Sequence, residues 1–253
     1  MVAKRLGEAG ARVLLHGRDQ ERGNRVVADI LRSGGTAEFL AADLGSLAEV
    51  RRLAETVRER TDRLDILINN AGIGTAGAAR QISADGHELR FAVNYLAGFL
   101  LTRLLLPVIR QSAPARIVNV ASAGQQPLDF ADVMLMRGYS GARAYCQSKL
   151  AQIMFTIDLA DELAGTGVAV NALHPATYMN TTMVRRAGVT PISSVEQGAE
   201  AILNLAASSD LAGCSGRYFN GLREARADAQ AYDASARQRL RAISLELTGA
   251  PSA

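Results

Sequence analysis

The sequence has no tryptophan and only two cysteines among its 253 residues. Two cysteines exclude a disulfide scaffold, because such a scaffold needs several paired thiols. Cys146 and Cys214 also lie too far apart for a local metal pair, and no histidine near either of them completes one. We therefore expect no metal site. A cytosolic, reducing location fits this cysteine usage best.

Long runs of one charge are also missing. The 28 basic and 25 acidic residues are nearly balanced and alternate along helical patterns, so they form no basic block. The sequence contains no zinc-finger, RNP or helix-turn-helix pattern. These absences argue against a nucleic-acid partner.

The chain shows no signal peptide and no clear membrane helix. Residues 1–10 include Lys4 and Glu8 and lack an apolar core. The most apolar stretch, residues 91–109, contains Asn94, Arg103 and Pro107, and a central arginine costs on the order of a few kcal/mol in a bilayer. We predict a buried helix of a globular domain and no membrane partner.

Short apolar runs alternate with helical patterns along the whole chain, which predicts an α/β protein. The runs are apolar on both faces, as expected for a parallel sheet covered by helices on both sides. The prediction is one domain over residues 1–253, with a Rossmann-like, doubly wound parallel sheet in a three-layer αβα arrangement. The expected strands are 12–16, 36–41, 64–68, 116–120, 168–173 and 216–219, and the main helices are 19–33, 46–61, 87–110, 145–164 and 195–207. Ligands of such sheets bind beyond the carboxyl ends of the strands.

Tyr145 and Lys149 are four residues apart in a predicted helix, so their side chains share one face. A free phenol titrates near pH 10, and a neighbouring ammonium favours the phenolate and lowers that pKa. A tyrosine tuned in this way can exchange a proton near neutral pH. The alternative is a solvated surface pair.

Two further polar residues are candidates for catalysis. Ser122 follows the predicted strand 116–120, where its hydroxyl could bond a substrate carbonyl and stabilise developing negative charge. The alternative is an ordinary turn serine. Asn94 lies in the middle of a helix, where a buried amide is costly unless it is hydrogen-bonded. The alternative is a bonded core asparagine.

Two other strand ends predict a binding surface. Asn70, Ala71 and Gly72 follow strand 64–68, and their small size lets the backbone approach a flat ligand. Asp43 and Leu44 follow strand 36–41, where the carboxylate could accept a hydrogen bond from an adenine amino group. The alternative for Asp43 is an acid near a helix N-terminus.

Taken in order, these motifs resemble the short-chain dehydrogenase/reductase family. The order is a strand-end Asp-Leu, a strand-end Asn-Asn-Ala-Gly, a helical Asn, a strand-end Ser and then Tyr-x-x-x-Lys. The resemblance runs from about Lys4 to Gly221. Segment 125–143, including Arg-Gly-Tyr-Ser-Gly at 137–141, and Leu-His-Pro at 173–175 look most like the retinol dehydrogenase and WW-domain oxidoreductase branch.

The resemblance implies an oxidoreductase that moves a hydride between nicotinamide and an alcohol or carbonyl carbon of a small substrate. It makes Tyr145 the acid/base and makes Lys149 the residue that lowers the Tyr145 pKa and holds the nicotinamide ribose. Ser122 positions the substrate oxygen, and Asn94 supports the lysine through water. Matching positions that contact the cofactor are Asp43, Leu44, Asn70, Ala71, Gly72, Tyr145, Lys149 and Pro175.

The end of strand 12–16 bears on the choice of cofactor. Sites for NAD place an acid there for the ribose diol, whereas this sequence has Gly17 followed by Arg18. A guanidinium suits a 2′-phosphate, so we predict that NADP(H) is preferred over NAD(H). Asp19 beside it leaves NAD(H) open. The alternative for Asp19 is a helix N-cap.

The sequence departs from the family pattern in two places. The family's first strand and its Gly-rich turn, about 20 residues, have no counterpart, so we expect a truncated sequence and a gap in the sheet with unpaired edges. The usual glycine after Pro175 is Ala176, and the threonine that should follow is Thr181 or Thr182. A second hypothesis is therefore a non-catalytic dinucleotide-sensing or partner-binding protein of this fold, or an inactive fragment.

Three segments carry coarser expectations. Segment 125–143 either roofs the pocket with Phe130, Met134, Leu135 and Met136, which favours a lipophilic substrate, or packs on the core. Helices 91–109 and 145–164 either form the face of a homo-oligomer or pack inside the protein. The tail, residues 223–248, is expected to be a solvated helix.

Overall fold

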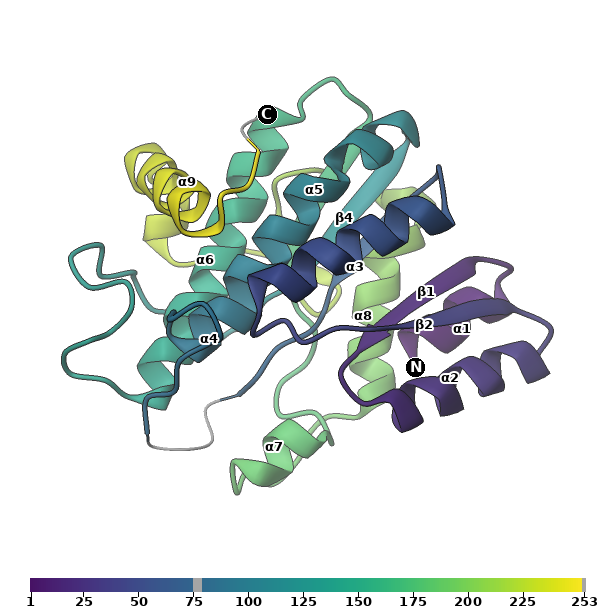
Figure 1. Cartoon of the computed structure of the whole chain (residues 1–253), viewed down its shortest axis with the longest axis horizontal. Coiled ribbons are helices and arrows are strands. Elements are labelled where there is room, and N and C mark those ends of the chain that lie inside the picture. Colours follow the sequence, from purple (N-terminus) through teal and green to yellow (C-terminus); the bar gives the residue numbers. More distant parts are fainter. Residues whose placement is uncertain (75–78, 252–253) are drawn as a thin grey trace.

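The computed structural model describes residues 1–74 and 79–251. These residues form the expected three-layer α/β arrangement (Figure 1). Strands β1 (Arg12–Gly17) and β2 (Thr36–Ala41) make a parallel pair. A second sheet has the order β3-β4-β5-β6-β7 and is parallel except for its last pair. Its strands are Ile66–Asn69, Ala115–Val120, Val168–His174, Tyr218–Asn220 and Arg223–Ala225.

The break between the two sheets is the gap that the sequence predicts. Among the residues described, β1 is paired with β2 alone and β3 with β4 alone, and no hydrogen-bonded ladder joins β1 to β3. Apolar residues of both strands, such as Leu14 and Ile68, are only half-buried. Each of these two strands therefore keeps one unpaired edge.

Helices cover both faces of the sheet. The main helices are α1 (Val2–Glu8), α2 (Gln20–Arg32), α3 (Leu47–Arg60), α4 (Leu89–Phe91), α5 (Ala97–Gln111), α6 (Gly141–Glu162), α7 (Thr182–Arg186), α8 (Val195–Ala207) and α9 (Ala234–Thr248). The alternation along β4 explains the two layers. Ile117 belongs to the large core cluster under α3, α5 and α6, whereas Val118 and Val120 belong to the smaller cluster under α8.

One described helix, Leu89–Gln111, is long and apolar enough to cross a membrane, and 78% of its most apolar window is buried inside the protein. Its Arg103 donates to Glu162 across 2.7 Å, so the charge is paired within the fold. The stretch is a core helix, as predicted.

The tail prediction is correct only in part, since the helix begins at Ala234 and one of its faces is buried. Helix α9 packs against α6 (Figure 1), because it carries Leu240 and Ser244 on a buried face. The Ser244 hydroxyl bonds the buried Tyr95 hydroxyl across 2.7 Å, and Arg241 Nε donates to Asp158 across 2.6 Å. Helix α9 covers part of α6, which contains most of one of the two helices predicted as the face of a homo-oligomer. Oligomerisation stays a prediction.

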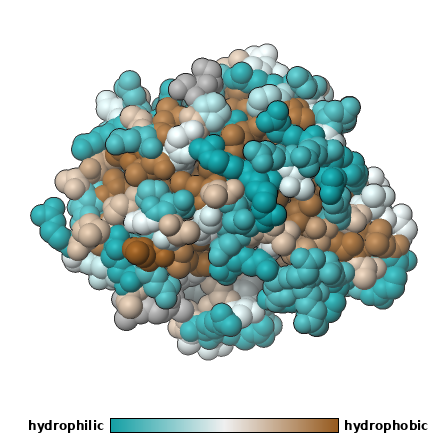
Figure 2. All heavy atoms as spheres, in the orientation of Figure 1, coloured by the Kyte–Doolittle hydropathy of each residue, from teal (hydrophilic) through white to brown (hydrophobic). Residues whose placement is uncertain are grey.

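The surface is mixed. Figure 2 shows hydrophobic residues exposed between hydrophilic ones on the face seen in Figure 1. Large exposed apolar side chains include Met136 on segment 125–143 and Tyr178 and Met183 after β5. The last two also line the cavity described next, so part of its mouth is apolar.

Candidate active site

A cavity of about 750 Å³ lies beyond the carboxyl ends of the strands. Residues that directly follow β1, β2, β3, β4 and β5 all line it, because a parallel arrangement brings these strand ends to one edge. Every predicted site residue except Asn94 is among its lining residues. These are Arg18, Asp43, Leu44, Asn70, Ala71, Gly72, Ser122, Tyr145, Lys149 and Pro175.

Of the two possibilities for segment 125–143, the structure contradicts the one in which the segment roofs the cavity. No described residue of segment 125–143 lines the cavity. Phe130 and Met134 pack against the core instead, which was the alternative for this loop. The apolar wall comes from the segment after β5, where Met183 and Val184 of α7 face the cavity, and Thr181 both lines it and caps α7 by accepting from Val184 N.

Tyr145 is held over Ser122. The helix that carries it begins at Gly141, four residues earlier than predicted, because Ser140 accepts from Arg143 N and acts as N-cap. The Ser122 hydroxyl lies close enough to the Tyr145 phenol to favour its ionised form. Ser122 Oγ accepts from Gly124 N across 3.1 Å. The Ser122 backbone carbonyl accepts from Tyr218 Oη and from Gln125 Nε2, each across 3.0 Å. The sequence did not reveal these two supports.

Burial raises the pKa of Tyr145 above its ordinary value of 10, and this outweighs the opposite effect of the Ser122 hydroxyl. The sequence predicted a lowered pKa. The difference arises because the Lys149 amine lies 5.9 Å from the centre of the tyrosine ring and is bonded elsewhere. At neutral pH the phenol therefore carries its proton.

Lys149 is 4% exposed and has no carboxylate partner in the described part of the chain. Its Nζ donates to the Val120 carbonyl across 2.8 Å and to Gln152 Oε1 across 2.9 Å. Burial without a counter-charge lowers its pKa from 10.5 to about 7. The amine can therefore gain or lose a proton near neutral pH.

Asn94 lies in a π-helical turn, Ala92–Leu96, between α4 and α5. Its amide bonds both backbone groups of Ile73, accepting from N across 2.7 Å and donating to O across 3.1 Å, and it also donates to Ser148 Oγ across 2.9 Å. It is thus the bonded core asparagine that the sequence left as the alternative. Its implied link to Lys149 through water stays a prediction.

Gly72 fits closely between Asn94 and Lys149. A Cβ on Gly72 would lie 3.2 Å from Asn94 Oδ1 and 3.4 Å from Lys149 Nζ. The contact with Asn94 is tight, so a side chain at this position would require the Asn94 amide to move by a few tenths of an ångström. The small residues after β3 therefore let the cavity reach the lysine.

At the other end of the cavity, Arg18 lies near Asp43, with Nη1 and Oδ1 4.0 Å apart. The Arg18 side chain is 63% exposed. Asp43 Oδ1 also accepts from Gly45 N across 2.9 Å. Asp19 caps α2 by accepting from Arg22 N, as its alternative interpretation predicted.

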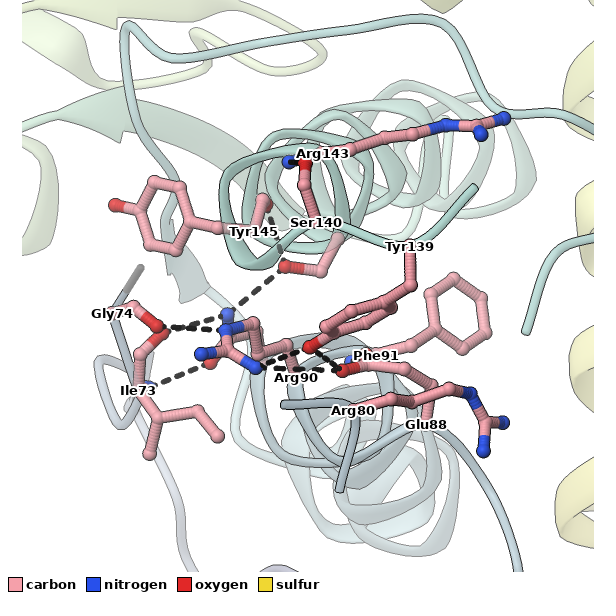
Figure 3. Close-up of polar contacts among 12 residues, drawn as sticks. Ile73, Gly74, Arg80, Glu88, Arg90, Phe91, Tyr139, Ser140, Arg143 and Tyr145 are labelled. Atoms are coloured by element: carbon pink, nitrogen blue, oxygen red, sulfur yellow. Dashed lines mark hydrogen bonds and ion pairs between the residues drawn. The ribbon is translucent and has the colours of Figure 1, made fainter. Parts of the chain in front are cut away.

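Sequence reasoning missed a buried ionic cluster, Glu88, Arg90 and Tyr139, which borders the site (Figure 3). Arg90 Nε donates to the Gly74 carbonyl across 2.9 Å, and Tyr139 Oη donates to Glu88 Oε1 across 3.1 Å. The cluster thereby ties the segment after β3, and Tyr139 of segment 125–143, to α4. The sequence did contain a signal for this cluster, because Glu88 and Arg90 are opposite charges in a mostly apolar helical stretch.

The cavity fits a nicotinamide nucleotide at two places. When protonated, Lys149 has a third N–H beyond the two that are bonded, and the exposed Arg18 guanidinium stands at the far end beside Asp43. The Gly-rich turn that the family uses for the pyrophosphate has no counterpart among the residues described. Those residues also contain no group of three histidine, cysteine or acidic side chains placed for a metal ion.

Comparison with known proteins shows the family. The family model described as short chain dehydrogenase matches residues 1–190. Human retinol dehydrogenase 13 is 37% identical over 275 residues, covering 99% of this chain and 82% of that protein.

Solved structures agree with this match. A protein from Mycobacterium paratuberculosis has a TM-score of 0.79 at 28% identity, covering 99% of this chain and 90% of its own. RhlG of Pseudomonas aeruginosa, solved as an active-site complex with NADP, has a TM-score of 0.70 at 31% identity over 87% of this chain and 88% of its own. The chain belongs to the short-chain dehydrogenase family, in the retinol dehydrogenase branch that its motifs resemble.

Proposed function

We propose that the protein is an NAD(P)(H)-dependent oxidoreductase that interconverts an alcohol and a carbonyl compound, with Tyr145 as the acid/base. The observation that carries this proposal is the meeting of Tyr145, Ser122 and Lys149 at one wall of the cavity. When bound, the nicotinamide would supply or accept the hydride.

The protein residues handle the proton. In carbonyl reduction, the protonated Tyr145 phenol gives its proton to the substrate oxygen while the Ser122 hydroxyl positions that oxygen. In alcohol oxidation, the proton moves the other way. The third N–H of the protonated Lys149 amine would hold the nicotinamide ribose.

The substrate class follows from the cavity wall. Met179, Met183 and Val184 supply apolar surface to the cavity that the catalytic groups also line, which suits a small lipophilic alcohol, aldehyde or ketone. The name of human retinol dehydrogenase 13 refers to a lipophilic alcohol and supports this class. We also propose a cytosolic location, from the cysteine usage alone.

A titration with NADPH, followed by turnover of aldehydes and ketones of increasing hydrophobicity, tests the proposal. We expect binding by fluorescence and rising kcat/KM with chain length. Nucleotide binding without turnover of any member of the series would favour the non-catalytic, dinucleotide-sensing alternative. No binding at all would contradict both.

We further propose that NADP(H) is preferred over NAD(H). Arg18 can give two parallel hydrogen bonds to a 2′-phosphate, which NAD lacks. Arg18→Ala is expected to raise the Kd for NADPH by about 10- to 100-fold, the loss of one charge-assisted interaction of ~1.5–3 kcal/mol. The Kd for NADH should change by less than about threefold, and equal losses for both nucleotides would remove the argument.

A further inference from the structure

The amine of Lys149 is held by a residue outside the motifs that identify the family. Gln152 lies three residues further along α6 and is 4% exposed. Its Oε1 accepts from Lys149 Nζ across 2.9 Å, and the Val120 carbonyl of β4 accepts across 2.8 Å. Gln152 is therefore the one side-chain acceptor that the described structure gives this amine.

No other side chain in residues 1–74 and 79–251 accepts a hydrogen bond from the Lys149 amine. Asn94, on the π-helical turn, spends its amide on Ile73 and Ser148. Gly72, which follows β3, offers no side chain. On α6 itself the facing titratable group is Tyr145, and no charged side chain among the described residues contributes to the pKa of the lysine.

We propose that Gln152 is a positioning residue for Lys149. In the protonated amine, two N–H groups bond Gln152 and Val120, and the third is left for a ligand in the cavity. An amide accepts a hydrogen bond without adding charge, so the amine is fixed in place and not neutralised by an ion pair. The proposal rests on the proposed function only in its consequence for the nucleotide, since the contact exists in the protein alone.

The composition makes a direct test practical. The sequence contains only two lysines, Lys4 and Lys149. Lys4 lies on a short surface helix with 47% of its side chain exposed. Protein labelled with ¹³C at lysine Cε therefore gives two NMR signals, and Lys4→Arg assigns them. The titration midpoint of Lys149 can then be read without substrate or nucleotide.

Gln152→Glu places a carboxylate where the amide stands, and the opposite charge should raise the Lys149 midpoint by about one pH unit or more. Gln152→Met keeps the length but removes the acceptor, so the midpoint should fall. Gln147→Met is the matched control. Gln147 is an equally buried glutamine of α6, but its amide donates to the Pro127 carbonyl across 2.8 Å. It should leave the midpoint unchanged.

The proposal is overturned if Gln152→Glu and Gln152→Met titrate like the wild type, or if Gln147→Met shifts the midpoint as much. Gln152→Asn, which withdraws the amide by one methylene, should lower the Lys149 midpoint as Gln152→Met does. It replaces the methionine variant in the titration if that variant does not fold. With nucleotide, Gln152→Met should raise the Kd for NADPH about tenfold. Midpoint shifts without any nucleotide binding would refute the proposed function and leave the positioning role intact.

Discussion

Tyr145→Phe is expected to lower kcat by about 10²- to 10⁴-fold, because it removes the one group placed to exchange a proton with the substrate oxygen. The ring remains, so packing against Ser122 and Gly124 should be kept. The Kd for NADPH should stay within about twofold of the wild type. Steady-state turnover together with a fluorescence titration measures both.

Tyr232→Phe serves as the control for this substitution. Tyr232 is a partly exposed tyrosine that does not line the cavity, and its hydroxyl accepts from the backbone of Ala227. It should leave kcat unchanged within about twofold. If Tyr145→Phe retains wild-type turnover, the proton is carried by another group and the assignment of Tyr145 is wrong.

The order of strands and helices could be predicted because the sheet is parallel and buried on both faces. Runs such as 116–120 must then be apolar throughout, and the residues that follow them must meet at one edge. That single property brought Asp43, Gly72, Ser122 and Pro175 to one cavity. It required no knowledge of side-chain contacts.

The features that the sequence did not reveal depend on contacts between distant segments. Segments 125–143 and 176–189 are both apolar enough to roof a pocket, and only the packing of Phe130 and Met134 on the core decides between them. Residues 223–248 are rich in alanine and arginine, yet Leu240 and Ser244 of α9 are buried. Local composition cannot tell which face of a helix meets a partner.

The Tyr145 pKa shows the same limit for the site. Spacing puts Tyr145 and Lys149 on one face of α6, and from spacing alone the ammonium lowers the phenol pKa. In the structure the amine is drawn toward Val120 and Gln152, and burial of the phenol has the larger effect. The sign therefore depends on hydrogen bonds that the helical repeat does not encode.

Arg90→Met is expected to be the most destabilising single change at the site. It leaves the carboxylate of Glu88, which is 1% exposed, with hydrogen bonds from Phe91 N and Tyr139 Oη but without its cation. Breaking a buried ion pair from one side costs about 3–5 kcal/mol, which lowers the Tm by on the order of 10 °C in a domain of this size. Thermal and urea unfolding measure the loss.

Two further variants separate the ion pair from a general loss of packing. Adding Glu88→Gln to Arg90→Met removes the orphaned charge and should restore more than half of the lost stability. Arg143→Met is the matched control. Arg143 points away from the cluster in Figure 3 and pairs with Asp129 across 3.2 Å in a more exposed setting, so it should cost less than about 1 kcal/mol.

Arg90→Met should also affect the cavity. Arg90 fixes the carbonyl of Gly74, a lining residue that lies against Met183 of α7. Releasing it loosens the apolar wall without touching Tyr145 or Lys149, so KM should rise severalfold while kcat changes little. Equal Tm losses for Arg90→Met and Arg143→Met would mean that the cluster does not stabilise the fold. An unchanged KM would mean that it does not shape the wall of the cavity.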